Sequence, residues 1–322
     1  MYTAPSLVNG FSETIRQIEA QIDELRNFKS LRARLDPSNV ILSGSGDSLA
    51  CALFVQALSN YKARVIDPYD LTLSPDLAKG KMVFFISISG KTATNVLASK
   101  LEQKNDALET IAITRERNSP LARSCSKTIL LDFLKGKEKT PGTNSFTSAL
   151  VTCSSLIRKI PRRLEVEPMI ESAKQWAKGS TDKLDPRAAI HFVGSGPFFG
   201  IAMYGMAKIV EFSGARATYQ SLEQFSHMDL FSLGSKDLVF ILRNSLNEEK
   251  ATLLDGYLRE SKLQSLLVPF PILEKYDTVE LAIWYSIHLQ YLGLECALKR
   301  GRKIPAFLSS KDILSISNNM IY

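Results

Sequence analysis

The sequence of 322 residues is poor in the residue types that build metal sites and disulfide frameworks. It contains only four cysteines and three histidines, and no two cysteines are spaced like the paired ligands of a zinc site. We therefore expect no metal or redox cofactor, and we interpret the cysteines as buried free thiols. They are Cys51, Cys125, Cys153 and Cys296.

Long apolar runs are also missing. The longest, such as 82–86, have the length of a strand and fall far short of the roughly 20 residues that cross a bilayer. The N-terminal residues lack the basic, then apolar, then small-residue order of a signal peptide. These two features predict a cytoplasmic protein with no membrane partner.

No long stripe of one charge is present, although the net charge is +7. The basic clusters at 158–163 and 299–303 are short and are typical of solvated surfaces. A positive balance favours acidic partners such as phosphorylated metabolites. Without a recognised nucleic-acid-binding module, the sequence does not predict a nucleic-acid partner.

What the sequence does contain is a regular alternation of short apolar strands with helical patterns. The predicted strands lie at 40–42, 63–67, 82–86, 110–114, 128–132 and 189–193. Alternation of this kind predicts parallel strands joined by crossover helices. The predicted fold is α/β, with two tandem doubly wound parallel sheets of flavodoxin-like type flanked by helices.

An internal repeat supports two tandem copies. NVILSGSG and AAIHFVGSG both place a Gly-Ser-Gly turn after a strand, and MVFFISISG corresponds to DLVFILRNS further along each copy. The expected organisation is leading helices at 1–35, a first domain at 36–159, a helical connector at 160–185 and a second domain at 186–322 with a C-terminal catalytic loop. Each copy would bind its ligand at the carboxyl ends of the strands.

A cluster of hydroxyl side chains follows the predicted strand at 82–86. Hydroxyls and unpaired N–H groups at a helix N-terminus together supply the donors that a phosphate group needs. Each serine alone is better explained as a helix cap, but together, on adjacent strand ends, the residues favour a ligand site. The residues predicted to form this phosphate site are Gly46, Ser48, Ser87, Ser89, Gly90 and Thr92.

The second copy carries polar residues inside an apolar helix. Tyr204, Lys208 and Glu211 are spaced four and three residues apart, which places them on one helical face. Burying charged groups is costly unless they are paired or functional. On spacing alone, a simple ion pair on a solvated face is the better explanation.

The motif S-x-S-G-x-T after a strand, with G-x-G-[DT]-S upstream, resembles the sugar isomerase (SIS) domain. The duplicated arrangement resembles the isomerase half of glutamine–fructose-6-phosphate amidotransferase and similar stand-alone archaeal glucosamine-6-phosphate deaminases. This resemblance extends from about residue 40 to 311. It implies that the serine loop binds the phosphate of a sugar and that the second copy supplies catalytic groups.

The same resemblance implies a role for each catalytic candidate. Glu211 would move a proton between C1 and C2 of the open-chain sugar, with Lys208 as a nearby cation. His227, sixteen residues after Glu211, would open the sugar ring and would come from the neighbouring subunit of a homodimer. Lys311 would form a Schiff base with the ketose; Lys303 is the fallback, and a tail lysine without a role is the alternative.

The sequence departs from the family pattern at several positions. Ile88 replaces a Gln of the serine loop, Tyr204 replaces a Glu, and Met228 and Asp229 replace the Gly-Pro that follows the ring-opening His. The second copy lacks the serine motif. The two other histidines, His191 and His288, lie in apolar segments and are interpreted as core residues.

The resemblance implies a sugar-phosphate aldose/ketose isomerase-type enzyme, most specifically an isomerising deaminase that converts glucosamine 6-phosphate to fructose 6-phosphate and ammonia. No Cys precedes Cys51, so we expect no glutaminase nucleophile. One alternative is a hexose-phosphate isomerase without amine chemistry. Another is a non-catalytic sugar-phosphate sensor, although the leading segment is too short for the helix-turn-helix domain that such regulators carry.

Overall fold

The computed structural model describes residues 9–31, 34–160, 164–182, 184–269 and 276–322. These contain two parallel sheets with helices on their faces, which confirms the predicted α/β fold. The chain forms two compact units. The first-sheet unit comprises residues 27–133, 144–163 and 312–322, and the second-sheet unit comprises 1–26, 134–143 and 164–311.

The first sheet has the strand order β2-β1-β3-β4-β5, and all of its pairings are parallel. Its strands are β1 (Val40–Gly44), β2 (Arg64–Val65), β3 (Met82–Ile86), β4 (Glu109–Thr114) and β5 (Lys127–Leu130). The chain direction across the sheet reverses between β1 and β3. In open parallel sheets this switch point is where ligands bind, at the carboxyl ends of the strands.

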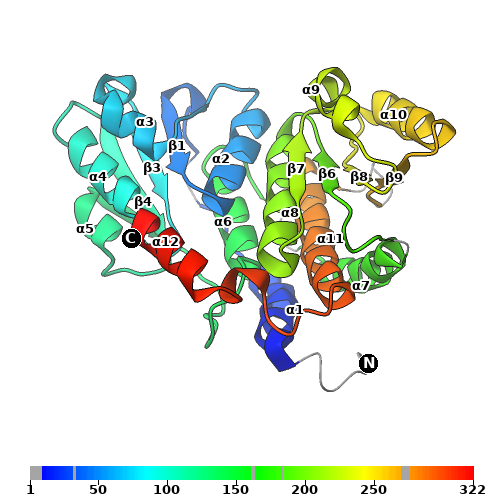
Figure 1. Ribbon diagram of the computed structural model, residues 1–322. Helices are drawn as coiled ribbons and strands as arrows, with labels where there is room; N and C mark the ends of the chain where they lie inside the picture. The colour runs from blue at the N-terminus through cyan, green and yellow to red at the C-terminus, as the bar shows by residue number, and fades with distance from the viewer. Residues whose placement is uncertain (1–8, 32–33, 161–163, 183, 270–275) are drawn as a thin grey trace. The chain divides into compact units, whose positions relative to one another are not determined.

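Helices cover both faces of the first sheet (Figure 1). On one face, Val83 and Phe85 pack against apolar residues of α3 (Pro68–Leu73), η3 (Pro75–Ala78), α4 (Ala93–Glu102) and α5 (Pro120–Ser124). The opposite face carries α2 (Asp47–Leu58) and α6 (Asn144–Ser155). The unit also contains η2 (Pro37–Asn39). Alternate residues of β3 thus point to opposite layers, as the period of a strand requires.

The second sheet has the order β7-β6-β8-β9 and is likewise parallel. Its strands are β6 (Ile190–Val193), β7 (Ala217–Gln220), β8 (Leu238–Ile241) and β9 (Gln264–Leu267). α9 (Leu222–His227) and α10 (Glu248–Glu260) cover one face through a shared apolar cluster. α8 (Pro197–Ser213), α11 (Thr278–Lys299) and α7 (Glu167–Thr181) cover the other, and α8 and α11 run side by side in Figure 1.

The remaining elements of the second-sheet unit are η1 (Asn9–Phe11), α1 (Ser12–Arg26), η4 (Asp229–Ser232) and η6 (Ala306–Leu308). α11 is buried along most of its length, including the polar side chains of Ser286, His288 and Gln290. Asp277 and Glu280 form a capping box at its start. The cap satisfies N–H groups that a buried helix end would otherwise leave without partners.

The two Gly-Ser-Gly turns have the same backbone conformation. Gly46 has φ 59° and ψ −128°, and Gly196 has φ 58° and ψ −131°. Each lies between a central strand and the helix that follows it, and in both sheets that strand is flanked by the next two strands of the sequence. The shared topology and turn geometry support the internal repeat inferred from the sequence.

The sequence treats the leading helices and the connector as segments outside the two domains, but the structure includes a helix of each in one unit. The leading helix α1 and the connector helix α7 belong to the second-sheet unit. Lys311, the candidate of the expected C-terminal loop, is the first residue of a helix, α12 (Lys311–Ile321). Ile313, Ile316 and Met320 have the helical spacing that indicates this element in the sequence.

All four thiols are free, as predicted, but Cys125 is only partly buried, so the prediction of buried cysteines is wrong for it. Cys51, Cys153 and Cys296 are buried, and burial raises the pKa of Cys296 to about 12. None of the described helices is long and apolar enough to cross a membrane. Within the described ranges, His, Cys, Asp and Glu side chains form no group suited to holding a metal ion.

Candidate active site

The serine loop begins where β3 ends. The Ser87 N–H donates to the Ile113 carbonyl at 3.0 Å, which extends the ladder between β3 and β4 by one bond. The hydroxyls of Ser87 and Thr92 lie 3.1 Å apart, and the Ser89 hydroxyl accepts from the Lys91 N–H at 3.3 Å. Because one hydroxyl of the Ser87–Thr92 pair donates to the other, the second keeps its proton for a ligand oxygen.

Gly90 is required by the local packing of this loop. Its φ of 60° is in the left-handed region, and a Cβ there would lie 2.2 Å from the Ser119 hydroxyl and 2.9 Å from that of Thr114. Its carbonyl accepts from the Leu121 N–H at 3.0 Å, which ties the loop to the start of α5. The absence of a side chain at Gly90 therefore allows the loop to pack against Ser119 and Thr114 of the same unit. This packing requires the glycine independently of any phosphate.

The first Gly-Ser-Gly turn opens at the same edge of the sheet as the serine loop. Gly44, at the end of β1, is paired with Ile86, at the end of β3. Ser48 lies in the first turn of α2 and is buried. A Cβ on Gly46 would contact nothing, so the space in front of this turn is open. Two helix N-termini, of α2 and α4, thus begin at neighbouring strands, as an anion site requires.

α8 carries the three polar residues expected on one face, and the structure brings them together. Lys208 is fully buried, and its Nζ lies 2.6 Å from Oε2 of Glu211, 3.1 Å from the Gly142 carbonyl and 4.8 Å from the centre of the Tyr204 ring. The Glu211 side chain keeps 34% of its surface exposed. The pair is therefore a buried cation with a carboxylate that still reaches solvent.

This geometry gives Glu211 a chemical capacity that an ordinary surface ion pair lacks. A buried ammonium holds its partner strongly because little water competes for the positive charge. A carboxylate held in place and still accessible can take a proton from a carbon next to a carbonyl. The simple ion pair on a solvated face is therefore wrong for Lys208, whose side chain has no exposed surface.

His227 lies on the surface of the second-sheet unit, at the end of α9. Its side chain is 67% exposed, and its Nε2 is 3.2 Å from Oε1 of Glu223. Glu223 also contacts Lys250, and these two neighbours lower the pKa of the Glu223 carboxyl, Lys250 the more strongly. The contacts of His227 are thus with α9 itself, and the structure does not join it to Glu211.

Lys311 and the fallback Lys303 are both exposed. Lys311 begins α12, whereas Lys303 precedes η6, and its carbonyl lies against Gly10. The two histidines predicted to be core residues are indeed buried. Burial lowers the pKa of His288 to about 4, and this ring bonds to the Ser172 hydroxyl and the Trp284 carbonyl.

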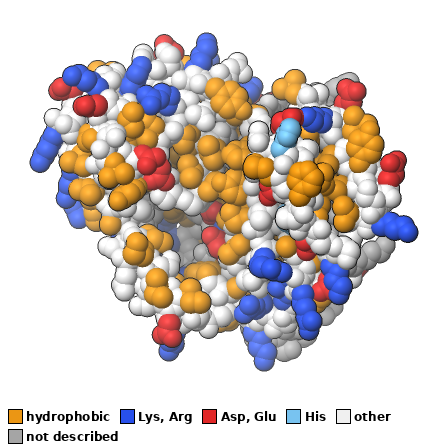
Figure 2. All heavy atoms as spheres, turned by 45° about the horizontal axis from the view of Figure 1, so that its top comes forward, with side chains coloured by type: hydrophobic (Ala, Val, Ile, Leu, Met, Phe, Trp, Pro, Cys, Tyr) orange, Lys and Arg blue, Asp and Glu red, His pale blue; other side chains and the backbone are white. Residues whose placement is uncertain are grey.

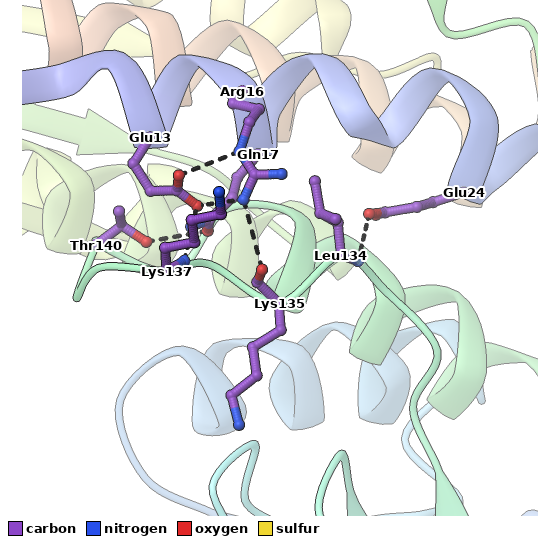
Figure 3. A network of polar contacts seen from close by, with 8 residues as sticks. All are labelled: Glu13, Arg16, Gln17, Glu24, Leu134, Lys135, Lys137 and Thr140. Carbon is purple, nitrogen blue, oxygen red and sulfur yellow. Dashed lines mark hydrogen bonds and ion pairs between the residues drawn. The ribbon is translucent and has the colours of Figure 1, made fainter.

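The partner that sequence reasoning missed is a main-chain carbonyl from a distant segment. Residues 134–143 lie along α1 in Figure 3, where Glu24 accepts from the Leu134 N–H and Glu13 accepts from the Lys137 N–H. This segment presents the Gly142 carbonyl to Lys208. Carbonyl acceptors carry no side-chain signal, so no motif could have revealed it.

Comparison with known proteins places the serine loop in a defined class of domain. Residues 36–159 match the family model of the SIS domain. It contains β1, β3 and the serine loop. The second-sheet unit lies almost entirely outside the matched residues.

The chain is also similar to a curated relative, the isomerizing glutamine–fructose-6-phosphate aminotransferase of Sulfolobus acidocaldarius. The two are 22% identical over 302 residues, which cover 84% of this chain and 50% of that protein. The chain thus spans about half the length of this relative.

Two solved structures share the fold over nearly the whole chain. Glucosamine-6-phosphate deaminase from Thermotoga maritima is 23% identical, with a TM-score of 0.75 over 90% of this chain and 95% of that one. Tagatose-6-phosphate ketose/aldose isomerase from Escherichia coli is 18% identical, with a TM-score of 0.73 over 94% and 96%. At these identities the likeness establishes the shared α/β architecture.

Proposed function

We propose that the protein is a sugar-phosphate aldose/ketose isomerase-type enzyme, and that it is an isomerising glucosamine-6-phosphate deaminase. The observation that carries the proposal is the pairing of Glu211 with the buried Lys208 on α8, 2.6 Å apart. The match of residues 36–159 to the SIS domain model supports a phosphorylated sugar as the ligand class. The names of the similar proteins support chemistry at C1 and C2 of such a sugar.

In the proposed reaction, Glu211 removes a proton from C2 of open-chain glucosamine 6-phosphate and returns it to C1. The carbon–nitrogen bond at C2 becomes an imine, which water hydrolyses to fructose 6-phosphate and ammonia. Lys208 keeps the carboxyl group oriented and favours its ionised form before the first transfer and after the second. His227 from the neighbouring subunit of a homodimer would open the ring, and Lys311 is the candidate for a Schiff base with the ketose.

Phosphate binding is assigned to the hydroxyls of Ser48, Ser87, Ser89 and Thr92, with Gly46 and Gly90 shaping the two loops that carry them. Binding at the phosphate and chemistry at C1 and C2 involve opposite ends of a hexose. Loss of a serine is therefore expected to weaken binding, whereas loss of Glu211 is expected to stop turnover.

The test is to incubate the protein with glucosamine 6-phosphate and, separately, with fructose 6-phosphate, and to follow sugar products and ammonia. We expect fructose 6-phosphate and ammonia in equal amounts from the amino sugar. Glu211→Gln is expected to lower kcat at least about 100-fold, because it removes the base. Glu171→Gln, an exposed change on α7, is the matched control and should turn over normally.

A hexose-phosphate isomerase without amine chemistry is the second candidate, and the likeness to a ketose/aldose isomerase favours it. Interconversion of fructose 6-phosphate with an aldose, with no ammonia from the amino sugar, would support this alternative. Binding of both sugars without any turnover would indicate a sensor. Normal turnover by Glu211→Gln would refute the role of Glu211 in either reaction.

A further inference from the structure

One main-chain oxygen, the carbonyl of Gly142, accepts two hydrogen bonds inside the second-sheet unit. The Lys208 ammonium donates to it at 3.1 Å and the Tyr204 hydroxyl donates at 2.8 Å. Both side chains are fully buried. A carbonyl has two lone pairs, so the two donors fill its capacity and fix each other's position.

A buried amide pair sets the direction of the Tyr204 hydroxyl. Gln290 Nε2 donates to the Tyr204 oxygen at 3.0 Å, and Gln290 Oε1 accepts from Gln21 Nε2 at 2.8 Å. Both glutamines are fully buried. A hydroxyl has a single proton, and since Tyr204 receives the amide hydrogen, its own proton is directed to the carbonyl. A chain of bonds therefore leads from α1 through α11 and Tyr204 to the Gly142 carbonyl.

The carbonyl itself is held from the other side. Gln17 on α1 accepts from the Thr140 hydroxyl at 2.9 Å, and Arg16 donates to the Lys135 carbonyl at 3.5 Å (Figure 3). Helix α1 thus fixes both the segment that carries Gly142 and, through Gln21, the amide that orients Tyr204. Both sets of contacts end at the Gly142 carbonyl oxygen, which accepts a hydrogen bond from the Lys208 ammonium.

The ring of Tyr204 makes a second contact with the same cation. The ammonium lies 4.8 Å from the ring centre, within the range of a cation–π interaction. Lys208 has three N–H donors and a flexible stem, so it needs such fixed neighbours to hold one orientation. Glu211 occupies a further direction at 2.6 Å.

We infer that Tyr204 is a positioning residue for the proposed reaction. Its hydroxyl fixes the Gly142 carbonyl and thereby aims the Lys208 ammonium at Glu211. The inference rests on the proposed function, in which Glu211 transfers the proton. A carboxylate held in advance by a fixed charge needs no rearrangement when the proton moves, and such preorganisation lowers the barrier of a reaction. Substrate binding by the serine loop does not depend on it.

Tyr204→Phe tests this, because the change removes the hydroxyl and keeps the ring. We expect kcat to fall by between about 10- and 100-fold, as for a displaced catalytic group, with KM for the sugar phosphate changed less than about twofold. The acid side of the pH–rate profile should move to higher pH, because a displaced ammonium favours the ionised Glu211 less. A purely structural role would move neither quantity.

Tyr285→Phe is the matched control. Tyr285 is also fully buried in the second-sheet unit and donates its hydroxyl to a main-chain carbonyl, that of Arg243, at 2.6 Å. Both variants are expected to lose similar thermal stability, but only Tyr204→Phe should lose kcat and shift the profile. Equal effects on kcat in both variants, or an unchanged kcat in Tyr204→Phe, would overturn the inference.

A readout without turnover separates this inference from the proposed function. In ¹⁵N NMR of the wild-type protein, the Lys208 ammonium should exchange its hydrogens slowly, because the Lys208 side chain is fully buried and hydrogen-bonded. Tyr204→Phe should speed this exchange, whereas Tyr285→Phe should not. If the wild-type protein has no activity on either sugar, the proposed function fails, and the exchange rates still decide whether Tyr204 positions Lys208. Unchanged exchange in Tyr204→Phe would refute the positioning.

Discussion

Hydroxyl groups of the serine loop are held in place by the protein itself. Ser87 and Thr92 contact each other, and Ser89 accepts from its own loop. A phosphate that binds there would exchange protein contacts for ligand contacts without ordering the side chains anew, which favours binding. The dependence of this loop on Gly90 follows from the same packing, because any Cβ would meet Ser119.

Removal of the Ser89 hydroxyl tests the assignment of the loop to phosphate binding. Ser89→Ala should raise KM for the sugar phosphate by about 10-fold, since hydrogen bonds to a charged group contribute about 1.5–3 kcal/mol, and kcat should change little. Steady-state kinetics measure both. Ser74→Ala is the control, because this serine is exposed and makes no side-chain cap bond. A fall in kcat with unchanged KM would contradict the assignment of the loop to binding.

Helix α4 contains a buried acidic group that the proposed reaction does not use. Glu102 is fully buried, and neither of its carboxyl oxygens has a hydrogen-bond partner within the part of the chain that the structure describes. Burial, and to a lesser extent the charge of Asp76, raises the pKa of Glu102 to about 7. Near neutral pH this carboxyl therefore exchanges between its neutral and charged forms inside the first-sheet unit.

The stability of the first-sheet unit should consequently fall as pH rises. Below the ordinary Glu pKa of 4.5, both folded and unfolded chains hold the proton, and the stabilising effect is complete. Between pH 4.5 and about 7 only the folded chain holds it, so the free energy of unfolding decreases until the folded carboxyl ionises. Glu102→Gln should remove this loss and stabilise the protein by roughly 2–3 kcal/mol at pH 8 relative to wild type.

Chemical denaturation at pH 5 and pH 8 measures this difference. Glu260→Gln on α10 is the control, since Glu260 is exposed and its replacement should leave the pH dependence as it is. Two results together would contradict a buried carboxyl with a raised pKa. The wild-type protein would be equally stable at pH 5 and pH 8, and Glu102→Gln would be no more stable than wild type at pH 8.

At the scale of the whole molecule, the position of His227 bears on assembly. The ring is largely exposed and contacts residues of its own surface. A surface His can complete the site of a neighbouring subunit, as the proposed homodimer requires, without any contact to Glu211 of its own chain. The two residues would then belong to different subunits in each active site.

Mixing two inactive variants tests this arrangement. Glu211→Gln and His227→Asn chains, unfolded and refolded together in equal amounts, should recover about a quarter of wild-type turnover, because half of the dimers are mixed and each has one intact site. Each variant refolded alone should stay inactive. If the mixture also stays inactive, His227 is not donated across an interface.

Local features of this protein could be predicted from its sequence because they obey short-range rules. The order of strands and helices follows from apolar spacing, and the face shared by Lys208 and Glu211 follows from the period of a helix. The two Gly-Ser-Gly turns were recognisable because only glycine adopts their positive φ without strain. The β7 and β9 strands were missed, since they are short and only partly buried.

The tertiary structure alone decided which distant groups surround Lys208. Its acceptor Gly142 is a main-chain carbonyl, and the amide pair that orients Tyr204 joins Gln21 to Gln290, 269 residues further along the chain. Such contacts have no period and no side-chain motif, because they form only when the helices of one unit pack together. The sequence by itself determined a carboxylate and a cation on one helical face, and the packing of α1, α8 and α11 decided that the cation is buried and held.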